Sequence, residues 1–240
     1  MRTAIFFKGC PLRCAWCHNP ESQAFDPEVM VSLEGSEEVI GRRYSVTELV
    51  EEATAEVLYY DQSGGGVTLT GGEPTCQDAD YLEQLAVALQ MRGISVGIDT
   101  SGVGPADTFS RLAPHVDFFL YDLKFIDDPA HRFWTGASNA LPLRNLELLA
   151  SLESSIYLRL ILLEGLNTDR DAIEATMTWL TERGIGVAGV NLLPYHRFGM
   201  DKYARLGRPA PAEFTTPTPE TLTRIRRQVE SRYPRVTIGG

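Results

Sequence analysis

Three cysteines stand close together near the start of the sequence, at Cys10, Cys14 and Cys17 in the run GCPLRCAWCHNP. A cubane iron–sulfur cluster has four irons, and three thiolates at this spacing can each bind one of them. The remaining iron then lacks a protein ligand and is free to bind a small molecule and pass it an electron. Clusters that only carry electrons usually have four cysteine ligands, so the spacing favours a catalytic cluster.

Two alternatives use the same cysteines without catalysis. A structural zinc ion needs a fourth ligand, but the nearest candidate, His18, directly follows Cys17, and adjacent residues rarely fit one tetrahedral site. A disulfide framework is disfavoured by the odd number of clustered cysteines and by a beginning that does not read as a secretory signal. The fourth cysteine, Cys76, is expected to be an inert, buried side chain.

Composition limits the class of protein. The 240 residues are 43% hydrophobic and 22% charged, which is ordinary for one globular domain spanning residues 1–240. The net charge of −10 argues against a nucleic-acid surface, which is normally basic. No apolar run has the length of a membrane span. These features together predict a cytoplasmic protein, which we expect to be a monomer.

Strand and helix patterns alternate along the sequence. Such alternation predicts an α/β fold with a parallel sheet, right-handed connections and helices outside, either as an open doubly wound sheet or as a partial barrel. Residues 18–44 show no periodicity and are expected to be loop. The six predicted strands cover residues 3–8, 67–70, 94–99, 117–122, 156–162 and 187–193, and helices are predicted from Ser45 to Val57, from Asp80 to Gly93, near 105–113, near 142–154, after Thr168, and after Thr218.

Helix starts carry recognisable capping residues. Ser45 with Glu48 forms a capping-box pattern, and Thr218 precedes a proline at the first helical position. Thr168 and Asp171 are expected to cap the helix between the fifth and sixth strands.

Polar or ionisable residues accompany the carboxyl ends of the predicted strands, where β/α barrels hold their active sites. Each has a plain alternative: the glycines could form a turn, the aspartates could cap helices, and Lys124 and His196 could be structural. Arg159 is harder to dismiss, because an unpaired charge inside an apolar strand is costly. The candidates are Gly71, Gly72, Glu73, Asp99, Thr100, Asp122, Lys124, Arg159 and His196.

Five segments in fixed order carry a family resemblance: FFKGCPLRCAWCHNPES, SGGGVTLTGGEP, DTSG, YDLK and LLPYH. Together they resemble the radical S-adenosylmethionine superfamily, and within it the activating enzymes of glycyl radical enzymes, of the pyruvate formate-lyase activating type. The resemblance covers nearly the whole chain and implies a partial (β/α)₆ barrel. Many relatives insert a ferredoxin-like segment after the first motif, but residues 18–72 contain no cysteine, so a single cluster is expected.

The resemblance also implies roles for individual residues. Cys10, Cys14 and Cys17 would hold a [4Fe–4S] cluster whose open iron binds the methionine part of S-adenosylmethionine, with Gly71, Gly72 and Glu73 at its ammonium group. Asp99 and Thr100 match a monovalent-cation site, although Lys124 could supply the same positive charge. The implied cofactor-binding residues are Trp16, Cys17 and His18 at the adenine, then Gly71, Gly72, Glu73, Asp122, Leu123, Lys124, Arg159 and His196.

The activity implied by this resemblance is hydrogen abstraction from a partner protein. A reduced flavodoxin or ferredoxin would supply one electron, and a 5′-deoxyadenosyl radical would remove a hydrogen from a glycine of a glycyl radical enzyme. The alternative keeps the cofactor and acts on a small molecule, as deazapurine-forming radical enzymes do. A third hypothesis is a metal-stabilised binding module without catalytic activity.

The beginning of the sequence carries one further expectation. Resembling activases have a DGPG-like segment and an IRT-like run before the first strand, where this sequence has only Met1-Arg2-Thr3. We therefore expect a missing segment whose acidic residue lies near the target glycine in the family. A chain without it would bind and slowly cleave S-adenosylmethionine but engage its partner poorly. A naturally short beginning is the alternative.

Overall fold

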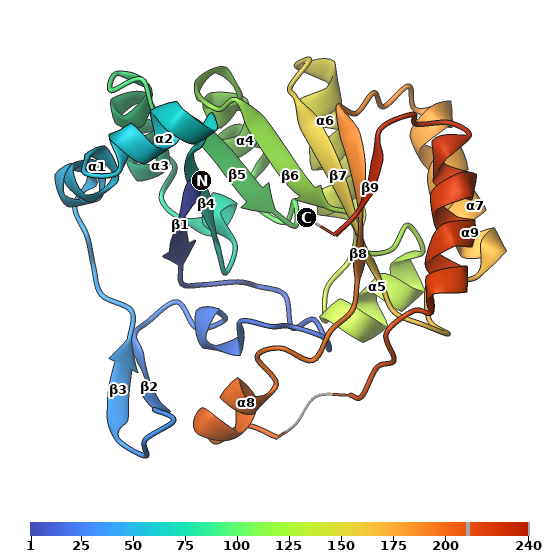
Figure 1. The fold of residues 1–240 in the computed structure, drawn as a ribbon, viewed down its shortest axis with the longest axis horizontal. Coiled ribbons are helices and arrows are strands. Elements are labelled where there is room, and N and C mark those ends of the chain that lie inside the picture. Colours follow the sequence, from blue (N-terminus) through green and yellow to red (C-terminus); the bar gives the residue numbers. More distant parts are fainter. Residues whose placement is uncertain (210–211, 240) are drawn as a thin grey trace.

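A single parallel sheet organises the molecule (Figure 1). The computed structural model describes residues 1–209 and 212–239. Neighbouring strands of the sheet are parallel throughout, in the order β1-β4-β5-β6-β7-β8-β9. The strands are β1 (Arg2–Phe7), β4 (Gly66–Gly71), β5 (Ser95–Thr100), β6 (Phe118–Asp122), β7 (Ile156–Leu162), β8 (Gly189–Pro194) and β9 (Val236–Ile238).

Helices cover the outer face of this sheet, because alternate strand residues are apolar and buried on that side. In β7 the buried residues Ile156, Leu158, Leu160 and Leu162 alternate with partly exposed ones that point to the concave inner face. The outer helices and 3₁₀ turns are α1 (Val46–Thr54), α2 (Val57–Ser63), η2 (Pro74–Cys76), α3 (Ala79–Gln90), α4 (Ala106–Leu112), η3 (Ala113–His115), α6 (Ala140–Ser151), α7 (Arg170–Glu182) and α9 (Pro219–Glu230).

The six strands predicted from the sequence are all confirmed, and a seventh extends the sheet. This last strand, β9, has only three residues, too few to show an alternating pattern. The element order therefore confirms the predicted α/β fold of strands joined by helical crossovers.

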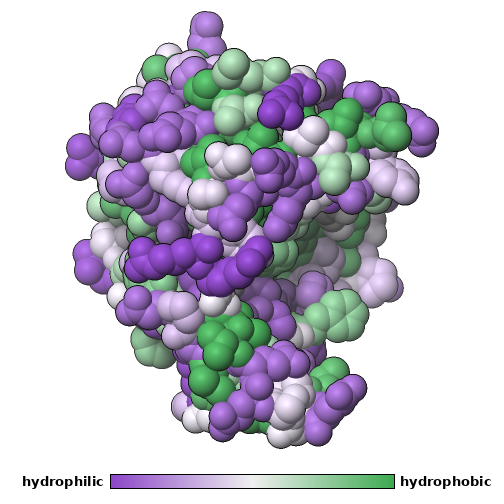
Figure 2. Space-filling model, turned by 90° about the vertical axis from the view of Figure 1, so that its left-hand side faces the viewer, coloured by the Kyte–Doolittle hydropathy of each residue, from purple (hydrophilic) through white to green (hydrophobic). Residues whose placement is uncertain are grey.

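The prediction of loop for residues 18–44 is wrong in part. This segment holds the turn η1 (Pro20–Ser22) and an antiparallel hairpin of β2 (Glu28–Val31) and β3 (Glu37–Ile40). Both strands have only four residues and begin with glutamate, so they are too short to show an alternating pattern. The hairpin exposes Val29, Val31, Leu33 and Val39, and apolar atoms gather at the lower end of the face in Figure 2.

Two helix predictions need correction, and two short helices were missed. The single helix expected from Ser45 to Val57 is two, because the chain leaves helical hydrogen bonding at Ala55–Glu56 between α1 and α2. The residue that caps α7 is Asp169, whose side chain accepts from the Ala172 amide. Two short helices were not predicted, α5 (Asp128–Thr135) and α8 (Asp201–Arg205), and both lie at the carboxyl ends of the strands (Figure 1).

The capping box of Ser45 and Glu48 and the Thr218 cap are both confirmed. Within the described ranges, no helix combines the length and the hydropathy needed to cross a lipid bilayer.

Asn145 joins an outer helix to the loops around the site, which makes it a test of the fold. Its side-chain amide is fully buried in α6 and donates to the carbonyls of Gly102 (2.7 Å) and Gly104 (2.8 Å) after β5. We expect Asn145→Leu to lower the free energy of unfolding by about 2 kcal/mol, since both buried carbonyls lose their donor. The exposed neighbour offers the control Arg144→Leu, and equal urea midpoints for the two variants would contradict the role of Asn145.

Candidate active site

The three clustered cysteines lie in the loop that follows β1. None of them forms a disulfide, and all three are half-buried. Two backbone hydrogen bonds, from Arg13 to Thr135 (2.7 Å) and from Ala15 to Trp134 (2.9 Å), tie the first half of the loop to the end of α5. The loop that holds the cysteines therefore has a defined conformation supported by a distant part of the chain.

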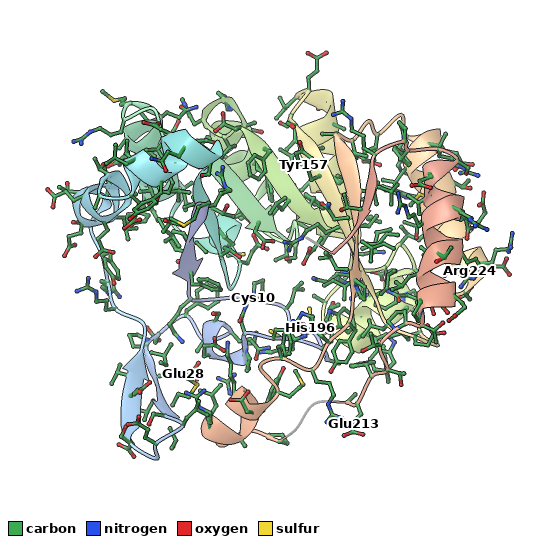
Figure 3. The ribbon with its side chains drawn as sticks, in the orientation of Figure 1. Cys10, Glu28, Tyr157, His196, Glu213 and Arg224 are labelled. Carbon is green, nitrogen blue, oxygen red and sulfur yellow. The ribbon has the colours of Figure 1, made fainter. Side chains whose placement is uncertain are left out.

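A cavity of about 580 Å³ brings this loop together with the carboxyl ends of the strands. Figure 3 shows Cys10 and His196 facing this central region from opposite parts of the chain. Among the predicted residues, those that line it are Cys10, Cys14, Trp16, Cys17, His18, Gly71, Gly72, Asp99, Asp122, Lys124, Arg159 and His196.

Two glycines after β4 are required by close backbone contacts. A Cβ at Gly72 would lie 2.5 Å from the carbonyl oxygen of Gly9, and one at Gly71 would lie 2.5 Å from the amide nitrogen of Phe7. Gly71 also has a φ of +109°, which side chains rarely allow. A larger residue at either position would push the β4 loop away from the cysteine loop.

The Glu73 side chain lies between the loops after β4 and β5. It is 1% exposed and is not among the residues lining the cavity. One oxygen accepts from Thr75 and from the Thr100 hydroxyl (2.6 Å), and the other accepts from the amide (2.8 Å) and hydroxyl (2.6 Å) of Ser101. Glu73 thus ties the loop after β4 to the loop after β5, and its predicted contact with a ligand ammonium stays a prediction.

Four buried charges alternate in sign across β5, β6 and β7. Arg159 donates to Asp99 (2.5 Å) and, through Nε, to Asp122 (2.6 Å), while Lys124 donates to the other oxygen of Asp122 (3.2 Å). Thr70 donates to the second oxygen of Asp99 (3.0 Å). The positive charge beside Asp99 is therefore Arg159, whereas Lys124, the predicted alternative to a cation, pairs with Asp122.

The two carboxylates differ in acidity because their partners differ. Burial raises the pKa of Asp99 to about 6, an effect that Arg159 only partly offsets. Burial acts in the same direction on Asp122, but Arg159 and Lys124 together lower its pKa to about 2. The Asp122 carboxylate thus stays ionised, whereas the charge of Asp99 changes with pH near pH 6.

Burial also determines the acidity of the three cysteine thiols. It raises the pKa of Cys10 and of Cys14 to about 12 and raises that of Cys17 as well. The positive charge of Lys124 acts in the opposite direction on all three thiols. Without a metal the thiols are therefore protonated, and binding of iron must release these protons.

Aromatic rings close one side of the cavity. The rings of His18 and His196 stack with centroids 4.3 Å apart, and His18 Nε2 contacts the carbonyl of His196 at 2.8 Å. Trp16 is 4% exposed and meets Phe125 and Phe214 edge to face, each at 5.9 Å. These flat, largely apolar surfaces suit a planar heterocycle and exclude water from the cysteine loop.

The donor set fits a four-iron cluster. Three free thiols share one cavity with cationic side chains that favour thiolates. In the described part of the chain, no three His, Cys, Asp or Glu side chains are close enough to bind one metal ion. A cubane cluster is larger than one ion, and its ligands are correspondingly farther apart.

The sequence predicted most of this lining but not all of it. Thr100 and Leu123 were predicted site residues, yet neither lines the cavity: Thr100 donates to Glu73 and Leu123 packs in the core. Ser101, within the DTSG run, could have been found from that motif. Gly239 could not, because it follows the unpredicted strand β9; further lining residues that were missed are Leu12, Asn19, Gln23, Thr70, Ile161, Leu193, Pro194, Tyr195 and Thr216.

Known proteins are similar to this chain in sequence. Residues 4–180 match the family described as the Radical SAM superfamily. The chain is 33% identical to the trans-4-hydroxy-L-proline dehydratase activating enzyme of Clostridioides difficile, covering 100% of this chain and 94% of that protein. It is 32% identical to the pyruvate formate-lyase 2-activating enzyme of Escherichia coli K12, covering 100% and 87%.

Solved structures give the same result for the fold. A domain of the pyruvate-formate lyase-activating enzyme from Bacteroides vulgatus superposes with a TM-score of 0.62 at 26% identity, covering 73% of this chain and 99% of that domain. Streptococcus suis SuiB bound to S-adenosylmethionine superposes with a TM-score of 0.68 at 14% identity, covering 100% of this chain and 50% of SuiB.

The acidity of Asp99 predicts a pH dependence of stability in the metal-free protein. An aspartate ionises near pH 4 in an unfolded chain but near pH 6 at Asp99 in the folded protein. The folded state therefore holds a proton that the unfolded state has lost, so this residue's contribution to stability falls as the pH rises from about 4 to 6. The free energy of unfolding of the wild type, relative to Asp99→Asn, should fall over that range and then level off. A difference that is independent of pH would contradict the assignment.

Proposed function

The chain belongs to the radical SAM superfamily, and we propose that it is an activating enzyme that forms a glycyl radical in a partner protein. One observation carries this proposal: a single cavity joins the three-cysteine loop to Gly71, Gly72, Asp122 and Arg159. The relatives that match most of the chain support it, because they are named as activating enzymes.

The cofactors supply the difficult chemistry, and the chain supplies their environment. When bound, the [4Fe–4S] cluster and S-adenosylmethionine provide a 5′-deoxyadenosyl radical by one-electron cleavage of a carbon–sulfur bond. Cys10, Cys14 and Cys17 would hold three irons at the wall of the cavity. The absence of a Cβ at Gly71 and Gly72 lets the β4 loop come close to the cysteine loop.

The ion-paired side chains in the cavity and the two stacked histidines would orient bound S-adenosylmethionine. Asp122, Arg159 and Lys124 line the cavity with fixed positions, because each is held by a buried ion pair. S-adenosylmethionine carries an ammonium, a carboxylate and a sulfonium, which complementary fixed charges can hold in one orientation. The planar stack of His18 and His196 would pack against its adenine.

Further features of the proposal follow from the resemblance. The 240 residues would form one radical SAM domain with one cluster and no ferredoxin-like insertion. A reduced flavodoxin or ferredoxin would be the electron donor, and the enzyme would act in the cytoplasm as a monomer. The glycyl radical enzyme that it activates is proposed only as a class, since relatives named for different partners are similar at 32–33% identity.

A monovalent cation at Asp99 and Thr100 remains part of the proposal. Asp99 already pairs with Arg159, and the cation would add positive charge between Asp99 and a cofactor carboxylate. Activity should then fall when potassium and sodium are replaced by large organic cations. Unchanged activity in such buffers would remove the cation and leave Arg159 as the only charge needed there.

Substitution of one clustered cysteine tests the proposed function. We expect Cys14→Ala to lose the cluster's visible absorbance, to lose its iron and sulfide, and to stop forming 5′-deoxyadenosine from S-adenosylmethionine, because one iron loses its ligand. The chain offers a matched control in Cys76→Ala, which removes a half-buried thiol from outside the cavity lining and should retain all three properties.

The partner is tested by electron paramagnetic resonance. Wild-type enzyme, reductant and S-adenosylmethionine should produce an organic radical on an added glycyl radical enzyme. Retained cofactor cleavage in Cys14→Ala would overturn the cluster assignment. Cofactor cleavage without a protein radical, but with turnover of a deazapurine precursor, would favour the small-molecule alternative.

A further inference from the structure

The second half of the cysteine loop is held by a segment nearly two hundred residues farther along the chain. This segment, residues 199–208, contains α8 and lies between β8 and α9. It contacts η1 and β2, which follow the cysteines (Figure 1). We call it the α8 latch.

The latch reaches three backbone carbonyls of the loop and hairpin. The Tyr203 hydroxyl donates to the carbonyl of Cys17 (3.1 Å), and Arg208 donates to the carbonyl of Pro20 (2.6 Å). Arg205 donates to the carbonyl of Val31 in the hairpin (2.6 Å). These bonds fix the path of the main chain from the third cysteine onward.

Two ion pairs strengthen the same contact. Lys202 pairs with Glu21 (2.6 Å) and also donates to Asn19 (3.1 Å), and Arg208 pairs with Glu28 (2.5 Å). Figure 3 shows Glu28 beside α8. The carboxylates are only 14% and 20% exposed, so loss of a partner would leave a poorly solvated charge. The second oxygen of Glu21 is buried and has no partner in the described residues.

A glycine allows the latch to approach this closely. Gly199 has a φ of +81°, and a Cβ at this position would lie 2.4 Å from the carbonyl oxygen of His18. The contact is therefore made by the main chain as well as by long side chains.

From these contacts we propose that the α8 latch positions Cys17 and His18, with Tyr203 as its central positioning residue. The inference rests on the proposed function for its purpose, since Cys17 is the third cluster ligand and His18 lines the cavity. The first half of the loop is held separately, by α5 through Thr135 and Trp134. The two halves should therefore respond independently to substitutions.

The variant Tyr203→Phe tests this independence, because it removes one hydroxyl and keeps the ring. In the metal-free protein, amide hydrogen exchange over residues 17–23 should accelerate about fivefold, the effect of losing one hydrogen bond. Exchange over residues 130–136 should not change. After reconstitution, release of iron to a chelator should be faster by a similar factor. Lys202→Met should have the larger effect in both measurements, since it leaves Glu21 without its partner.

The control is Tyr59→Phe, on α2 far from the loop, where the side chain is 56% exposed. It should leave both measurements as in the wild type. Unchanged hydrogen exchange over residues 17–23 in both latch variants would overturn the proposal. Equal acceleration over residues 17–23 and 130–136 would also overturn it, because it would indicate a general loss of stability. The exchange measurement needs no cluster, so failure of the wild type to bind iron would contradict the proposed function and not the latch.

Discussion

The mutual neutralisation of four buried charges is the constraint on which the site depends. Asp99, Asp122 and Arg159 lie on the neighbouring strands β5, β6 and β7, Lys124 follows β6 by two residues, and each of the four has at least one partner of opposite sign. Asp122 and Arg159 are paired in register on β6 and β7, so a shift of either strand by one residue would bury an unpaired charge. The register of β6 and β7 is therefore tied to the pairing of these charges.

The same constraint connects the fold to the chemistry. Lys124 pairs with Asp122 and also favours the thiolate form of Cys14. The register of β6 and β7 and the acidity of Cys14 are therefore linked through this one side chain. The loops are joined in a similar way. Glu73 links the loops after β4 and β5, while α5 and the α8 latch hold the two halves of the cysteine loop. The loops after β1, β4 and β5 are thus each held by contacts from outside their own sequence motif.

Much of this organisation could be predicted from the sequence, for identifiable reasons. The first six strands of the sheet carry apolar residues and alternate with helical patterns, and the carboxyl ends of parallel strands necessarily meet, so the motif residues could be expected to share a cavity. The sequence could not show that Glu73 ties the loops after β4 and β5 together, because the hydroxyl groups that hold it come from a different strand end. Nor could it show α8 or β9, which are too short to produce a periodic pattern.

The central claim is that one iron of the cluster is free for a ligand while the chain's three cysteines hold the others. Mössbauer spectroscopy of wild-type enzyme reconstituted with ⁵⁷Fe, with and without S-adenosylmethionine, measures this directly. The account predicts that one of the four irons changes its signal when S-adenosylmethionine is added and that the other three do not. Four equivalent irons whose signals do not change when S-adenosylmethionine is added would contradict it. A protein that takes up zinc without sulfide would also contradict it.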